Sequence, residues 1–62
     1  MNIQERTHSI VDTAREHGAH ITGMVDVSTQ YELAIAFFEG RGYTVTVDAD
    51  TGAYVINKTI EG

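Results

Sequence analysis

The segment Tyr31–Phe38 constrains the fold of this chain more than any other feature. Its sequence is Tyr-Glu-Leu-Ala-Ile-Ala-Phe-Phe, which is apolar almost throughout. Residues of a helix are placed about 100° apart, and one side of this helix would collect Tyr31, Ala34, Ile35 and Phe38. Leu33 and Phe37 occupy a neighbouring side. A helix that is apolar on most sides must be buried on most sides. We therefore expect a second chain to complete its cover.

The length and composition predict a single domain, residues 1–62. A chain of 62 residues is near the lower limit for independent folding. It contains no cysteine, which excludes disulfides and thiolate metal sites. Stability must then come from tight packing, from a metal bound without cysteine, or from association with another chain.

The charge distribution argues against nucleic-acid binding. The net charge is −5, and the four basic residues lie far apart in the sequence: Arg6, Arg15, Arg41 and Lys58. A phosphate-binding surface needs clustered cations. No apolar stretch approaches the roughly 20 residues of a membrane span, and no leader pattern is present. We expect a cytoplasmic protein without membrane or nucleic-acid partners.

The N-terminal residues predict a helix over Ile3–His17. A narrow apolar stripe has helical spacing: Ile3, Thr7, Ile10, Val11 and Ala14. Asn2 is the expected N-cap, with Glu5 reaching back to it, and Gly18 is the expected left-handed end. The following stretch, Ala19–Val27, has no clean period and predicts a connector, with a short strand near residues 19–25 as the alternative.

A second helix is expected to begin at Ser28 or Thr29 and to end near residues 40–42. Thr29 and Glu32 have the spacing of a capping box, in which each side chain accepts a hydrogen bond from the other residue's backbone N–H. The Gly40-Arg41-Gly42 segment is interpreted as the stop of this helix.

The C-terminal part predicts a β-hairpin. Residues 43–48 alternate between apolar and polar, and Asp50-Thr51-Gly52 is a turn signal. A three-residue loop would pair Val47 with Val55 and mix polar and apolar side chains on both faces. A four-residue loop pairs Val47 with Tyr54 and is favoured because one face then collects Tyr43, Val45, Val47, Tyr54 and Ile56. The predicted fold is α+β in the order α-α-β-β.

No residue pattern indicates catalysis or a cofactor. His8 and Asp12 point the same way on a helix and, with His17 or His20, have the composition of a small metal site. A solvated helix face explains them more simply. The segment 48–52 is similar in residue types to the start of a calcium-binding loop but lacks the further ligands that such a loop requires. We expect no enzyme activity, no catalytic residue, no cofactor and no bound metal.

The helix ending Phe37-Phe38-x-x-Arg41-Gly42-Tyr43, followed by a strand, a glycine turn and a second strand, resembles small accessory proteins of tailed bacteriophages. The resemblance covers residues 31–56. An aromatic residue often closes the last strand in those proteins, whereas Asn57 stands here. The resemblance implies a non-enzymatic binder of a virion or host protein and assigns no functional residue.

These observations together predict a protein-binding module. The expected partner is the chain itself, as a homodimer or higher oligomer, or another protein. The contact residues expected from the uncovered helix side and the hairpin are Tyr31, Ile35, Phe38 and Tyr54. Two alternatives remain open: an acidic mimic of nucleic acid that blocks a basic host protein, and a small winged DNA-binding domain.

Overall fold

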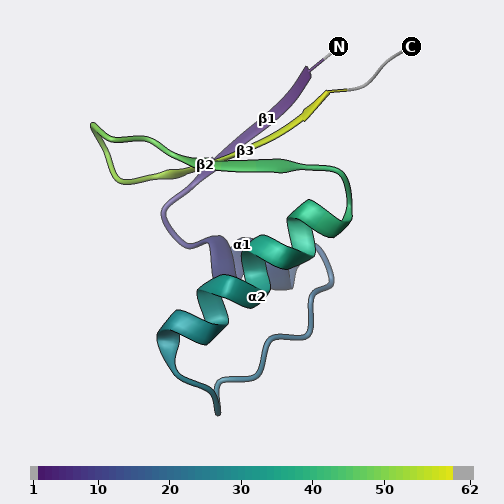
Figure 1. The fold of residues 1–62 in the computed structure, drawn as a ribbon, viewed down its shortest axis with the longest axis vertical. Coiled ribbons are helices and arrows are strands. Elements are labelled where there is room, and N and C mark those ends of the chain that lie inside the picture. The colour runs from purple at the N-terminus through teal and green to yellow at the C-terminus, as the bar shows by residue number, and fades with distance from the viewer. Residues whose placement is uncertain (1, 60–62) are drawn as a thin grey trace.

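The computed structural model describes residues 2–59 and shows a three-stranded antiparallel sheet with both helices on one face (Figure 1). The elements are β1 (Asn2–Thr7), α1 (Ile10–Glu16), α2 (Val27–Gly40), β2 (Thr44–Val47) and β3 (Tyr54–Thr59). The strand order is β1-β3-β2, so the two ends of the described chain pair with each other. The α+β class is confirmed. The order α-α-β-β is incomplete, because a strand precedes the helices.

The predicted helix Ile3–His17 is wrong in its first half. Residues 2–7 pair along β3 in the register Asn2↔Thr59 to Thr7↔Tyr54, and the helix begins only at Ile10. The N-cap is Ser9, whose hydroxyl accepts a hydrogen bond from the Asp12 N–H at 3.3 Å. The expected cap at Asn2 lies within β1. An unpaired edge of β3 would leave a row of backbone groups without partners, and β1 satisfies them.

The end of α1 follows the sequence-based expectation. Gly18 has a φ of 101°, which favours glycine, and the Ala19 N–H returns to the Ala14 carbonyl at 2.9 Å. No strand forms in residues 19–25. This segment is a loop held by Arg15, whose Nη2 donates to the Ile21 carbonyl at 2.9 Å. The Ile21 side chain is buried in the core.

Helix α2 begins one residue before the predicted start, and its cap differs from the predicted one. The N-cap is Asp26, and the Thr29 hydroxyl donates to its carboxylate. The Thr29–Glu32 capping box is therefore wrong, because Thr29 is already inside the helix. The hydrogen bond from Thr29 lowers the pKa of Asp26 below its usual value. The helix ends at Gly40, within the predicted range.

The hairpin has the register predicted for a four-residue loop. Val47 pairs with Tyr54 and Val45 with Ile56. The Asp48 N–H donates to the Ala53 carbonyl at 2.8 Å, and the Gly52 N–H donates to the Asp48 carbonyl at 2.8 Å. Gly52 has a φ of 74°, so a glycine at this position avoids the strain of a left-handed L-residue.

The core lies between the helices and the helix-facing side of the sheet. Its buried members come from both helices, the α1–α2 loop and β3: Ile10, Val11, Ala14, Ile21, Ala34, Phe38 and Ile56. Phe38 is 1% exposed. Three rings surround it edge-on, with centroid distances of 5.4 Å to His17, 5.3 Å to Phe37 and 5.6 Å to Tyr43. The chain itself therefore provides the cover for Phe38 that the sequence suggested a second chain would supply.

The sheet face away from the helices buries Val55 and Ala53. Val55 is in register with Arg6 on one side and Thr46 on the other. Arg6 Nη1 forms an ion pair with Asp48 Oδ2 at 2.9 Å and so joins β1 to the hairpin. Side chains from both neighbouring strands thus flank the central strand on a face that the alternation pattern marks as polar.

Candidate functional site

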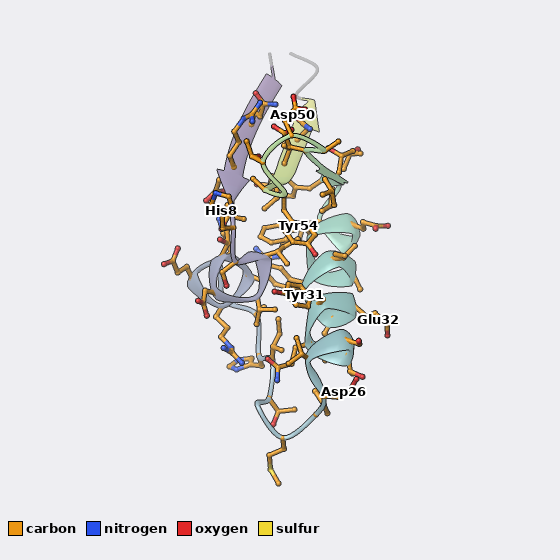
Figure 2. All side chains as sticks on the ribbon, turned by 90° about the vertical axis from the view of Figure 1, so that its left-hand side faces the viewer. His8, Asp26, Tyr31, Glu32, Asp50 and Tyr54 are labelled. Atoms are coloured by element: carbon orange, nitrogen blue, oxygen red, sulfur yellow. The ribbon has the colours of Figure 1, made fainter. Side chains whose placement is uncertain are left out.

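The four predicted contact residues do not form one exposed surface. Tyr31 and Tyr54 stack on each other with centroids 5.8 Å apart and ring planes 21° apart. Figure 2 shows this pair between the helices and the sheet. Both rings and the Ile35 side chain are half-buried against the core, and Phe38 lies within the core. The stack fastens α2 to β3 and leaves Phe38 out of reach of another chain.

The sheet instead offers a different candidate, the outer edge of β2. We call residues Thr44–Val47 the β2 edge. Their sequence is Thr-Val-Thr-Val, with no charge and no proline. Thr44, Thr46 and Val47 are exposed, and Val45 is half-buried. Proteins usually protect an exposed edge strand with charges, proline or a bulge, and the β2 edge has none of these.

The ladder shows which backbone groups of β2 are free to bind. The Asp48 N–H donates to the Ala53 carbonyl, so the backbone groups of Asp48 point toward β3. Backbone groups alternate in direction along a strand, so those of Thr46 and Thr44 also point toward β3. The N–H and C=O groups of Val45 and Val47 therefore point away from the sheet, and no other described strand pairs with them.

The same alternation in backbone direction shows which groups of β1 point away from the sheet at the opposite edge. Residues 54 and 56 of β3 direct their backbone groups toward β1, where they meet Thr7 and Glu5. The outward groups of β1 belong to Gln4 and Arg6, and both of these side chains are exposed. The β1 edge therefore presents Glu5 and Arg6 charges, unlike the β2 edge.

Side chains next to the β2 edge add an apolar contact. Val47 is 60% exposed, although it lies on the helix-facing side of the sheet. It is the last residue of β2, next to the hairpin loop that projects beyond the helices (Figure 1). A further strand beside β2 would cover part of this side chain.

Acidic residues precede and follow the same edge in the chain. Glu39 lies at the end of α2, and the N–H of Gly42 returns to its carbonyl at 3.0 Å just before β2 begins. Asp48 and Asp50 follow the other end of β2. A hydrogen bond from the Asp50 N–H, then one from Arg6, lowers the pKa of Asp48 below its usual value, which keeps its carboxylate ionised.

The four cations of the chain are all engaged within it. Arg6 pairs with Asp48, and Arg15 binds the Ile21 carbonyl. The Arg41 guanidinium lies 4.4 Å from the Phe37 ring centroid, and the Lys58 ammonium lies 5.1 Å from that of Tyr43. These positions form no basic patch.

Across residues 2–59 there is no cavity and no group of three potential metal ligands. His8, Asp12 and His20 are exposed, whereas His17 Nε2 lies 3.2 Å from Glu5 Oε2. Neither α1 nor α2 has the length and apolar character needed to cross a membrane.

Comparison with family models, with curated proteins and with solved structures gave no match. None of the contact residues predicted from the sequence lies in the β2 edge. The available signal was the lack of any charge between Arg41 and Asp48 in an alternating strand. That signal is ambiguous from the sequence, because a central strand has the same composition.

Proposed function

We propose that this protein is a non-enzymatic protein-binding module that accepts an additional β-strand at the β2 edge. The observation that carries the proposal is the pair of outward backbone groups at Val45 and Val47, on an uncharged and exposed strand. In strand addition, backbone hydrogen bonds supply affinity, and alternate side chains supply specificity. The resemblance to phage accessory proteins supports a binding role, with the cytoplasm, of the host if the chain is viral, as the proposed location.

Two kinds of occupant fit the β2 edge. A second copy would pair its own β2 in antiparallel orientation and give a homodimer with a continuous sheet. A different protein would contribute an extended segment. Both kinds satisfy the same backbone groups, so a single variant tests the function for either.

The two alternative functions have less support. An acidic mimic needs its carboxylates on one face, but Glu32 points away from α1 (Figure 2), where Glu16 lies. A winged DNA-binding domain needs free cations near its hairpin. Lys58 and Arg41 are held over aromatic rings, and Arg6 is paired with Asp48.

The test uses proline to remove one outward N–H at a time. Val47→Pro blocks the β2 edge without removing a hydrogen bond to β3, because proline is tolerated where the N–H faces solvent. Gln4→Pro does the same to the β1 edge and is the matched control. Tagged wild-type protein and both variants would be mixed with untagged copies and with lysate of the native host.

We expect wild type and Gln4→Pro to retain the same bound protein and Val47→Pro to lose it. Circular dichroism must show that both variants are folded. Equal capture by Val47→Pro would contradict the proposed function, and so would the absence of any bound protein, including a second copy.

A further inference from the structure

We infer that the occupant of the β2 edge is an extended segment of another protein that carries lysine or arginine at its ends, rather than a second copy of this chain. This inference rests on the proposed function and adds the chemistry of the partner. It follows from the charges beside the edge and from the geometry of pairing two identical edges.

Acidic residues flank the β2 edge along the chain on both sides. Glu39 is exposed and directly precedes the turn into β2, and Asp50 is exposed just after it. Glu32 lies two turns before Glu39 and therefore on the same face of α2. Figure 2 shows Glu32 pointing away from α1. Of the two helices, α2 is the one that packs against β2, so this is also the side of the open edge.

The cations near this edge do not cancel the negative charge. The Arg41 guanidinium is stacked on Phe37, and Arg6 is already paired with Asp48. The whole chain carries a net charge of −5. A cationic segment would be attracted during the encounter, and its terminal charges would face Glu39 and Asp50 after binding.

A second copy fits less well. Antiparallel pairing of two β2 strands continues the sheet and keeps both helix layers on the same face. The α2 sides that carry Glu32 and Glu39 would then face each other across the new junction, and like charges in that position are repulsive.

The side chains of β2 also indicate which side chains suit such a segment. Partner residues that hydrogen-bond to the backbones of Val45 and Val47 would place their side chains beside these valines. Apolar side chains at those partner positions would cover the exposed part of Val47. Positions in between lie beside Thr44 and Thr46 on the other face and suit threonine. Alternating valine and threonine with a cation at each end therefore matches the β2 edge.

The probe is a labelled peptide, acetylated and amidated, of sequence Lys-Val-Thr-Val-Thr-Val-Lys. Its counterpart has glutamate in place of both lysines, and a third peptide has alternate backbone amides methylated. Binding is measured by fluorescence anisotropy at low and at physiological salt. We expect the lysine peptide to bind about tenfold more tightly than the glutamate peptide, with a smaller ratio at higher salt. The methylated peptide should not bind.

Protein variants locate the charges without disturbing the fold. In the Glu32→Gln/Glu39→Gln double variant, the preference for the lysine peptide should fall at least severalfold. Glu16→Gln, an exposed position on α1, is the matched control and should leave the preference unchanged. Val47→Pro should abolish binding of the lysine peptide.

The possible failures are distinguishable. Equal binding of the lysine and glutamate peptides, with both lost in Val47→Pro, would overturn the basic partner while leaving strand addition intact. A homodimer in sedimentation velocity that Val47→Pro dissociates and the lysine peptide does not displace would assign the edge to a second copy. Peptide binding that is unchanged in Val47→Pro would overturn the proposed function as well.

Discussion

The two edges of the sheet belong to strands that pair with the same central strand, yet they differ in chemistry. The β1 edge carries Glu5 and Arg6, and each makes a contact outside its own strand. Arg6 binds Asp48 on the hairpin, and Glu5 binds His17 at the end of α1. The β2 edge consists of uncharged threonine and valine whose side chains make no hydrogen bond or ion pair within the described residues. The β1 edge is thus protected by charge and bonded to neighbouring elements, whereas the β2 edge is open to a further strand.

This difference indicates that protection and binding are divided between the two sides of one small sheet. Charged residues at an edge oppose the addition of a further strand, whereas an uncharged β-branched edge favours it. A domain that must stay monomeric needs protection on both sides. The absence of protection at β2 is therefore the feature that most needs a functional explanation.

The largest expected effect comes from truncating a buried side chain of β3, the central strand with which both edge strands pair. Ile56 is 1% exposed on the central strand, and Ile56→Ala should lower the free energy of unfolding by about 2–5 kcal/mol. Val47→Ala on the β2 edge should cost less than about 1 kcal/mol, because Val47 is 60% exposed. Urea unfolding followed by circular dichroism measures both. Similar losses would mean that Val47 is already covered in solution, as in an oligomer.

Hydrogen exchange tests the backbone directions on which the comparison depends. The amides of Val45 and Val47 should exchange faster than those of Thr44 and Thr46, because the latter are bonded to β3. Thr46→Pro should then destabilise the protein by about 0.5–1.5 kcal/mol more than Val47→Pro, the net worth of one hydrogen bond. The reverse order, for either exchange or stability, would place the free backbone groups at the wrong residues.

The smallest expected effect concerns the ion pair that attaches the β1 edge to the hairpin. The pKa of Asp48 is lowered in the folded protein, first by the Asp50 N–H and then by Arg6. Ionised Asp48 therefore stabilises the fold above the ordinary aspartate pKa of about 3.9, and this contribution is lost as the pH falls through the lowered value.

Urea unfolding at pH 7 and at pH 3 should therefore show Asp48→Asn to be less stable than wild type at pH 7 and closer to it at pH 3. Arg6→Gln should show the same trend with a smaller amplitude, because the hydrogen bond from Asp50 remains. A difference between wild type and Asp48→Asn that grows as the pH falls would contradict the assignment.

Local patterns predicted the C-terminal half of the fold well. The alternation of residues 43–48 and the position of Gly52 specified the hairpin register, because turn geometry and side-chain alternation constrain it together. The stop of α2 near Gly40 and the left-handed Gly18 were also predicted from the sequence. Each of these features depends on residues that are close in the chain.

The N-terminal half shows where local patterns are insufficient. Ile3, Thr7 and Ile10 have helical spacing, but β1 forms because β3 offers it a full ladder from Asn2↔Thr59 to Thr7↔Tyr54. That partner lies at the other end of the chain, so no window of neighbouring residues contains it. The lack of information on distant neighbours also affected the predicted contact residues. Phe38 was expected at the surface because the positions of α1 and Tyr43 around it were unknown.

The sequence by itself determined the α+β class, the C-terminal ends of both helices, the hairpin register and the excess of apolar surface in Tyr31–Phe38. These features follow from residue spacing and from glycine positions. Only the tertiary structure decided that β3 is the central strand, that Phe38 is covered within the chain, and that β2 is left as an open edge. The physical reason is that the free or bonded state of a backbone group depends on which strand lies beside it, and that neighbour is distant in sequence.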